Sequence, residues 1–454
     1  MRTNYDYRWS YDFSHHLAFI RWMATTFALP GLDLTREAYH PPLYYLIAGT
    51  AMRLGVRESR LGTISIVCGA LRLLVLRKVF NRWLGRSSLG AQVALLVAAL
   101  QPTSIHLDGM ATGEGLSNLE AAVAMWLVPS LFWRDRAAGS RGRLAGRPSW
   151  RAAALGIVLG LALLTKISVL SILAALAVGV ALECFWAWRA AAREAGSLRR
   201  GGPRPGGLRG VLAAWLVVGA LAASISGWYF ARNLKLYGKP FLSGFDGPDK
   251  YLMNAVRGTP FFERRPVEYF HCWTSDIYRF PYYPSGVQPR SCFWPQLVAS
   301  SWVDFYRYGF SNGQGPGALR TPILQAARAS VAGGTVLGVC AAATTLWLLG
   351  WAWRRQDAAL LSLMLMPVIA LGGQLYFATA FPIDGQGMVK GLYLQFASPP
   401  LYAAIGLAVS WLWRSRLGRP IALALLACIA LVGSYSIACR FLPAPGAQPG
   451  GGIG

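Results

Sequence analysis

The chain has 454 residues, of which 54% are hydrophobic and only 14% charged, and its mean hydropathy is +0.38. This composition excludes an ordinary soluble domain and indicates a membrane protein. The net charge of +25 would suit a nucleic-acid partner. However, no aromatic residues interleave the clustered arginines as a base-stacking surface requires, so we expect no nucleic acid.

Apolar residues gather in runs about as long as a helix needs to span a ~30 Å hydrocarbon core. We therefore predict an all-α polytopic membrane protein with about 10–11 transmembrane helices. The predicted crossings lie near residues 61–78, 89–105, 114–133, 152–165, 167–187, 210–229, 328–352, 358–379, 391–412 and 419–439.

Arginines crowd four loops between these crossings, at 134–151, 189–209, 354–355 and 414–419. The positive-inside rule places such loops in the cytoplasm, which fixes the side of every other loop. We expect five regions: a first extracytoplasmic loop with juxtamembrane helices at 1–60, N-terminal transmembrane helices at 61–229, a long extracytoplasmic loop at 230–327, C-terminal transmembrane helices at 328–440 and a flexible tail at 441–454.

The first outer region combines an amphipathic helix with a Pro-Pro step. Asp12 and His16 are four residues apart in DFSHHLAFIRWMATTFALP and share one face of a helix lying on the membrane. A helix cap is the alternative role for Asp12. In EAYHPPLYYLIAG, Glu37 and His40 precede two prolines, and 41–56 reads as a juxtamembrane or re-entrant helix at the outer face. No hydrophobic segment precedes this region, so we expect an earlier start or a lost helix.

Two charged residues mark helix ends further along the chain. Glu114 in TGEGLSN opens a crossing, where complementing the helix dipole is its alternative role. Lys166 in LLTKIS is the only charge between two adjacent crossings. A lysine there is a functional candidate by default, although its ammonium group can also snorkel to the interface.

Further cations lie on the predicted outer side, against the usual bias. Arg232 follows a crossing in GWYFARNLKLYGKPF, together with Lys235 and Lys239, so these side chains are candidates for holding an anion. Lys390 and Tyr393 in DGQGMVKGLYLQF lie at the outer mouth of another helix.

The cysteines allow a disulfide and indicate no metal site. Cys272 and Cys292 both lie in the long outer stretch, where a bridge is chemically permitted. The sequence is compatible both with a disulfide between these two cysteines and with free thiols. No Cys/His spacing typical of metal binding occurs, so we predict no metal ligand.

Together these segments place carboxylates and cations on one membrane face, beside a re-entrant aromatic segment. That combination suits a reaction between an amphiphilic anionic donor and an acceptor at the interface. A carboxylate can take a proton from an attacking hydroxyl, while cations stabilise a departing phosphate.

The two outer motifs DFSHHLAFIRWMATTFALP and EAYHPPLYYL resemble the first outer loop of polyprenyl-phosphate-dependent glycosyltransferases of the GT-C class. This class includes the protein O-mannosyltransferases and the aminoarabinose transferase that modifies lipid A. TGEGLSN resembles the second-loop pattern Thr-Asn-Asp-x-Leu-x-Asn, with Glu114 where Asp is usual. LLTKIS, GWYFARNLKLYGKPF and MVKGLYLQFASPPL resemble recurring pieces of the bacterial branch, and all matches run in order from about residue 10 to 405.

The resemblance implies a GT-C-type bundle in the bacterial inner membrane, with its active site on the extracytoplasmic side. It implies inverting transfer of a sugar from a polyprenyl-phosphate donor to a hydroxyl of a glycan, lipid or protein, within membrane lipid. Asp12 is then the general base, Glu114 is a second catalytic candidate, and the substrate-binding candidates are His16, Glu37, His40, Lys166, Arg232, Lys390 and Tyr393. No cofactor is certain, although Glu37 and His40 leave room for a divalent cation.

Two other classes compete with this interpretation. A transporter or flippase of a lipid-linked sugar would keep ionisable residues near the bilayer midplane, often in repeats. The crossings hold few charges and show no internal repeat. The other class is a structural membrane protein without catalysis. The transferase interpretation predicts that Asp12, Glu114, Lys166 and Lys390 converge near one cavity at the outer face.

Overall fold

The computed structural model describes residues 13–132, 150–195, 206–246, 258–279, 281, 292–303, 321–382 and 389–441. Within these residues the chain forms α-helices and short 3-10 helices and no strand, so the predicted all-α fold is confirmed. Residues 442–454, nearly all of the expected tail, lie outside the described residues.

The first half contributes α1 (Phe13–Thr26), η1 (Arg36–Tyr39), α2 (Leu43–Arg53), η2 (Glu58–Arg60), α3 (Gly62–Leu84), α4 (Leu89–Leu100), α5 (Pro102–Leu107), α6 (Glu114–Leu127), α7 (Pro129–Phe132), α8 (Trp150–Thr165), η3 (Ile167–Val169), α9 (Leu170–Ala195) and α10 (Gly206–Tyr237). The second half contributes η4 (Gly244–Asp246), η6 (Phe261–Glu263), α12 (Glu268–His271), α13 (Asp276–Arg279), α14 (Phe293–Trp302), α15 (Thr321–Arg355), α16 (Ala358–Ala380), η8 (Gly391–Ala397), α17 (Pro399–Trp413) and α18 (Arg419–Phe441).

The predicted polytopic architecture is confirmed by the length and hydropathy of the helices. Six helices in the described part of the chain can cross a membrane: Glu114–Phe132, Ile167–Arg189, Gly210–Tyr237, Ile323–Arg355, Ala358–Ala380 and Arg419–Ala438. Counting the bent pair of η8 and α17 as one span brings the number in this part of the chain to seven. The other expected crossings coincide with α3, which carries four basic residues, and with the shorter apolar helices α4 and α8.

The structure differs from the predicted crossings at several helix ends and breaks. The crossing expected at 391–412 is broken, because η8 and α17 meet at an angle of 75°. Proline suits the first turn of a helix and not its interior, so Pro399 and Pro400 begin α17 and do not continue η8. α10 runs on to Tyr237, past the predicted end at 229, and α15 begins at Thr321 and not at 328.

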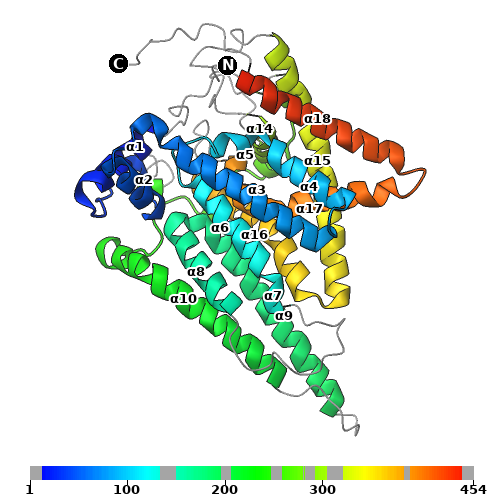
Figure 1. The fold of residues 1–454 in the computed structure, drawn as a ribbon, viewed down its shortest axis with the longest axis horizontal. Helices are drawn as coiled ribbons and strands as arrows, with labels where there is room; N and C mark the ends of the chain where they lie inside the picture. Colours follow the sequence, from blue (N-terminus) through cyan, green and yellow to red (C-terminus); the bar gives the residue numbers. More distant parts are fainter. Residues whose placement is uncertain are drawn as a thin grey trace.

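Small residues allow close packing between neighbouring helices. α8 packs along α10 (Figure 1), where Gly156 and Gly160 face the second helix. A Cβ atom at Gly156 would lie 2.8 Å from the Val218 carbonyl oxygen, and one at Gly160 would lie 2.8 Å from Ile225 Cβ. This small-xxx-small spacing is the one that lets transmembrane backbones approach closely.

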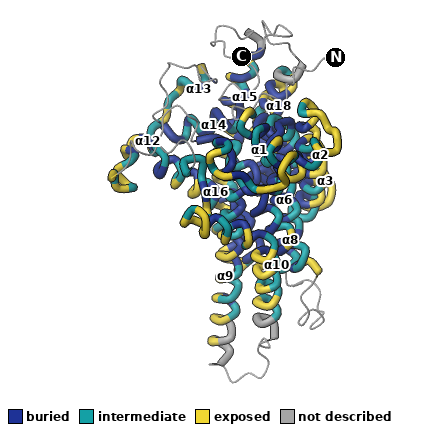
Figure 2. The backbone as a smooth tube through the Cα atoms, turned by 90° about the vertical axis from the view of Figure 1, so that its left-hand side faces the viewer, coloured by how far each residue is buried: buried dark blue, intermediate teal, exposed yellow. Residues whose placement is uncertain are grey.

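The two ends of the bundle differ. α9 and α10 extend beyond the rest of the protein at one end, whereas α1, α2, α12, α13 and α14 gather at the opposite end (Figure 2). α15 ends with Arg354 and Arg355. This end of α15, where it turns into α16, lies toward the same end of the bundle as the tips of α9 and α10 (Figure 1).

A disulfide joins two helices of the gathered end. Cys272, at the C-terminal cap of α12, is bonded to Cys292, at the N-terminal cap of α14. The bridged form left open by the sequence is therefore the one observed. Phe293 and Leu297 of α14 are buried beside Tyr269 of α12, so the bridge closes a packed apolar cluster.

We expect Cys272→Ser to lower the midpoint of heat unfolding in detergent. The bridge closes a loop with a sequence separation of 20, and a loop of that size restricts the unfolded chain by about 3 kcal/mol. Cys428→Ser, at a free and partly exposed cysteine, is the matched control and should leave the midpoint unchanged. Equal midpoints for the two variants would show that the bridge does not stabilise this end.

Candidate active site

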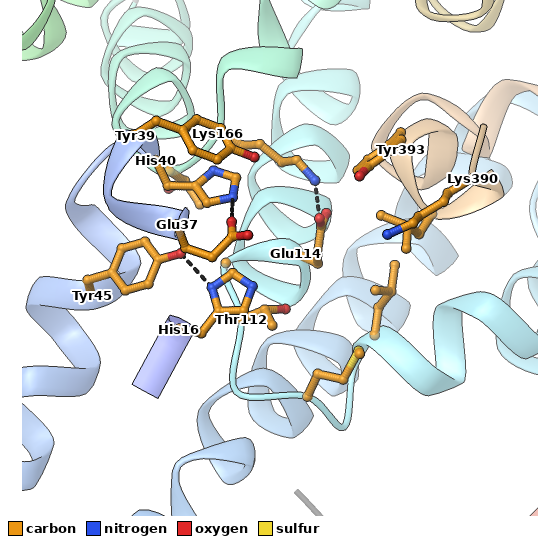
Figure 3. A pocket seen from close by; sticks show the side chains of 15 residues that line it. His16, Glu37, Tyr39, His40, Tyr45, Thr112, Glu114, Lys166, Lys390 and Tyr393 are labelled. Atoms are coloured by element: carbon orange, nitrogen blue, oxygen red, sulfur yellow. Dashed lines mark hydrogen bonds and ion pairs between the residues drawn. The ribbon is translucent and has the colours of Figure 1, made fainter. Parts of the chain in front are cut away.

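A polar cavity of about 80 Å³ lies where η1, the start of α6, the break between α8 and η3, and η8 meet (Figure 3). It is smaller than the ~300–1,000 Å³ typical of ligand pockets, so it matches one reacting group and not a whole lipid-linked sugar. Its lining consists of His16, Glu37, Tyr39, His40, Tyr45, Leu107, Met110, Thr112, Gly113, Glu114, Thr165, Lys166, Lys390, Leu392 and Tyr393.

An ion pair between Glu114 and Lys166 forms one wall of the cavity. Glu114 is the first residue of α6, and Lys166 follows the last residue of α8 with an extended backbone (φ −156°) that ends the helix. The Lys166 ammonium group donates to Glu114 Oε1, and both side chains are largely buried. Removing either charge would leave the other poorly solvated.

The Tyr393 ring lies near two ammonium groups. The Nζ atom of Lys166 is 5.2 Å from the centre of the Tyr393 ring, and the Nζ atom of Lys390 is 5.8 Å from it. Lys390 is buried and stands immediately before η8, the helix that carries Tyr393. Both distances are within the range of cation–π attraction, so the ring keeps two like charges in one small space.

The opposite wall contains a carboxylate–imidazole pair. His40 Nε2 lies 2.7 Å from Glu37 Oε2. Burial raises the pKa of the Glu37 carboxyl, but the hydrogen bond and charge of His40, with the charges of His16 and Lys390, outweigh burial and lower the pKa from 4.5 to about 2. Glu37 is therefore an ionised acceptor at neutral pH.

The rings next to this pair are stacked. The His16 and His40 rings lie 5.8 Å apart, centre to centre, and the His16 Nδ1 atom is 2.7 Å from the Tyr45 hydroxyl. Tyr45 in turn stacks on Phe19 at 3.9 Å. Because α1 supplies His16 and Phe19 while α2 supplies Tyr45, the packing of these two helices fixes the imidazole positions.

Hydrogen bonds hold η1 and the residue before it against α10 and α1. The Tyr229 hydroxyl on α10 donates to the carbonyl oxygen of Tyr39 at 3.0 Å. A second bond of 3.0 Å joins His15 Nδ1 on α1 to Thr35 Oγ1 before η1. The cavity wall that carries Glu37 is thus tied to helices on both sides.

A buried polar network positions η8. Arg72 on α3 donates to Asp108 Oδ2 at 2.8 Å and to Ser104 Oγ at 3.2 Å. The Ser104 and Tyr402 hydroxyls each donate to Gln395 Oε1 on η8 at 2.9 Å. This network therefore links the inside of α3 to the element that carries Lys390 and Tyr393.

Two close contacts complete this network. The backbone N–H of Gly391 donates to Ser300 Oγ on α14 at 2.8 Å, so α14 also holds the first residue of η8. Gly69 on α3 faces Asp108, where a Cβ atom would lie 2.5 Å from Asp108 Oδ2. Only glycine leaves room for the carboxylate in its pairing with Arg72.

The structure brings most of the predicted site residues together. His16, Glu37, His40, Glu114, Lys166, Lys390 and Tyr393 all line the cavity. Arg232 does not. It lies on α10, where its Nη2 atom donates to the Pro30 carbonyl oxygen at 3.3 Å, and its anion-binding role stays a prediction. Asp12 lies outside the described residues, immediately before α1.

Several members of the site were not recognised from the sequence. Tyr39, Tyr45, Thr112 and Thr165 line the cavity, although their short or aromatic side chains gave no separate signal. The pairing of Arg72 with Asp108 was not predicted either. The signal that could have found it is the charge of Arg72 inside a predicted crossing.

The described residues contain no group of three or more His, Cys, Asp or Glu side chains arranged to hold a metal ion.

Three solved structures are similar to the chain at low identity. The Archaeoglobus fulgidus oligosaccharyltransferase tethered to an acceptor peptide has a TM-score of 0.46 and 13% identity, over 93% of this chain and 51% of that one. ArnT from Cupriavidus metallidurans in the apo state has a TM-score of 0.39 and 14% identity, over 96% and 70%. The same protein bound to undecaprenyl phosphate has a TM-score of 0.33 and 14% identity, over 95% and 71%.

The chain thus spans about half the length of the oligosaccharyltransferase. One of these proteins is named as an oligosaccharyltransferase, and the other, ArnT, has been solved with undecaprenyl phosphate bound. No family model and no curated protein matches the sequence. At these TM-scores the similarity assigns no role to any residue.

We expect the stability contributed by Glu37 to depend on pH. Its pKa is lowered in the folded state, so this stability is fully present above pH 4.5 and is lost as the pH falls toward 2. The difference in free energy of unfolding between wild type and Glu37→Gln should reach about 3 kcal/mol near neutral pH and disappear near pH 2. Exposed Glu268→Gln is the control, and a difference independent of pH would contradict the pairing.

We expect Arg72→Met to destabilise the protein by about 3 kcal/mol, because it removes the cation that pairs with the partly buried Asp108 side chain. The measurement is the midpoint of heat unfolding and the fraction of protein that elutes as a single species. Arg77→Met, an exposed position on the same helix, should change neither. The double change Arg72→Met/Asp108→Asn should recover part of the loss, and no recovery would separate Arg72 from Asp108.

Proposed function

We propose that this protein is an integral-membrane glycosyltransferase. It transfers a sugar, with inversion, from a polyprenyl-phosphate donor to a hydroxyl acceptor at the extracytoplasmic face. The observation that supports the proposal is the convergence of Glu114, Lys166 and Lys390 on one cavity (Figure 3). They come from segments far apart in the chain, and a structural protein has no need to bring them together.

The two lysines suit the phosphate of the donor. A sugar linked through phosphate to a polyprenyl chain carries one negative charge, and the departing polyprenyl phosphate carries two. Lys166 and Lys390 provide fixed positive charge in a largely buried setting, where it stabilises the second negative charge as it develops. Phosphate is a good leaving group, so this chemistry requires no strong general acid.

A carboxylate balances the other half of the reaction. When the acceptor hydroxyl attacks the anomeric carbon, its oxygen forms the new bond, the bond from that carbon to the phosphate oxygen breaks, and a carboxylate takes the hydroxyl proton. The protonated carboxyl loses one negative charge while the phosphate gains one. The net charge of the cavity is therefore the same before and after transfer.

Two residues are proposed for the catalytic carboxylates. Asp12 is the general base suggested by its motif, and it directly precedes α1, whose His16 lines the cavity. Glu114 Oε1 accepts a hydrogen bond from the Lys166 ammonium group. Phosphate would compete with it for that ammonium group and leave the Glu114 carboxylate available to the acceptor.

Charge distribution supports the proposed side of the membrane. Arg354 and Arg355 end α15, and the arginine-rich segment between α9 and α10 joins the tips that extend from the bundle. The positive-inside rule assigns that end to the cytoplasm of a bacterial inner membrane. The gathered end, with α1, α2 and α14, would then face outward (Figure 2).

Transport or flipping of a lipid-linked sugar is the competing function. It requires a polar path through the centre of the bilayer. The ionisable side chains of the polar cavity lie at helix ends and in 3-10 segments, not at the centres of spans. This placement favours transfer chemistry over transport.

We expect Glu114→Gln, Lys166→Met, Lys390→Met and Asp12→Asn each to reduce transfer by ~10²–10³-fold, because each removes a charge that acts on the transition state. The measurement incubates membranes with radiolabelled polyprenyl-phosphate sugars and follows label entering an acceptor. Lys235→Met, at an exposed lysine on α10, is the matched control. Equal labelling by the Lys166, Lys390 and Lys235 variants would exclude the cavity as the active site.

A further inference from the structure

A second cavity, of about 380 Å³, lies at the other end of α6 from Glu114. Its walls come from the end of α3, the start of α7, and α15, α16 and α17. The lining consists of Trp83, Leu84, Pro129, Trp347, Leu348, Trp351, Asp357, Ala359, Leu360, Leu363, Met364, Ala403 and Leu407. Apart from Asp357 it is apolar, and its volume falls in the range of ~300–1,000 Å³ that suits a ligand.

Two tryptophans of α15 connect this cavity to the surface of the bundle. Trp347 is 60% exposed and Trp351 is 39% exposed, although both line the cavity. Around a spanning helix such as α15, that exposed surface faces lipid. The cavity is therefore open to the hydrocarbon of the membrane, where a lipid chain can enter it sideways.

The mouth of the cavity is positively charged. Arg355 lies over the Trp351 ring, with its Cζ atom 5.5 Å from the ring centre, and the exposed side chain of Arg354 precedes it. The carboxylate of Asp357 accepts the backbone N–H of Leu360 at 3.0 Å as the N-terminal cap of α16, and the two arginines outweigh its single negative charge. Basic side chains beside an apolar intramembrane pocket are the arrangement that recognises anionic lipid headgroups.

We propose that this cavity binds one acyl chain of an anionic phospholipid, whose phosphate contacts Arg354 and Arg355. The site is separate from the polar cavity, because the length of α6 places them roughly 20 Å apart. Tryptophan side chains at the level of the headgroups favour this depth. The occupant is a structural lipid of the arginine-rich face, and not the donor of the transfer reaction.

The test uses the full chain purified in detergent and mixed with phosphatidylglycerol or phosphatidylcholine of the same acyl chains. Retained lipid is counted by native mass spectrometry. Each arginine near the headgroup raises the affinity for an anionic lipid by a factor of about five. The wild type should therefore retain phosphatidylglycerol with about a thirtyfold preference over phosphatidylcholine. Arg354→Gln/Arg355→Gln should abolish the preference. The control Arg414→Gln/Arg416→Gln changes two exposed arginines in the turn between α17 and α18 and should keep the preference.

Filling the cavity tests the acyl chain separately. Ala403→Trp and Leu363→Trp both place a large ring in the lining and should reduce retained phosphatidylglycerol by at least about tenfold, while each protein still elutes as a single species. Equal retention of the two lipids by the wild type would overturn the proposal. Unchanged retention in either folded tryptophan variant, or displacement of the lipid by polyprenyl phosphate at equal concentration, would overturn it as well.

Discussion

The ion pair between Arg72 and Asp108 is the constraint on which the polar cavity depends. Arg72 is 4% exposed, so its charge must be matched by protein atoms and not by water. The hydrogen bonds that match it continue through Ser104 to Gln395 on η8. Because η8 carries Lys390 and Tyr393, helix packing in the bundle, and not the adjoining loop, sets the position of the second ammonium group.

Much of this arrangement could be predicted from the sequence. Apolar run length gave the all-α membrane fold, because a spanning segment must satisfy its own backbone hydrogen bonds. Residues such as Glu114, Lys166 and Lys390 could be chosen because a charge at a helix end near lipid is costly unless it has a use. The positive-inside rule predicted that they lie on one side of the membrane. The structure places them in one cavity.

The remaining features depend on contacts between segments distant in the chain, which periodicity does not encode. The prolines at 399 and 400 could have indicated the break that the predicted crossing at 391–412 missed, but the 75° angle follows from how α14 and α3 hold η8. The continuation of α10 to Tyr237 involves tertiary contacts such as the bond from Arg232 to the Pro30 carbonyl oxygen, in a stretch where the hydropathy of the sequence has already declined. Likewise, nothing in its own segment indicates that Arg72 pairs with Asp108.

The contact between Gly69 and Asp108 has a consequence for how this protein can change over generations. A methyl group at residue 69 would collide with the carboxylate, so a single-step replacement there would also require a new partner for Arg72. Related chains should therefore exchange these three positions jointly or retain all of them. An alignment of close relatives would reveal this as correlated variation between α3 and the end of α5.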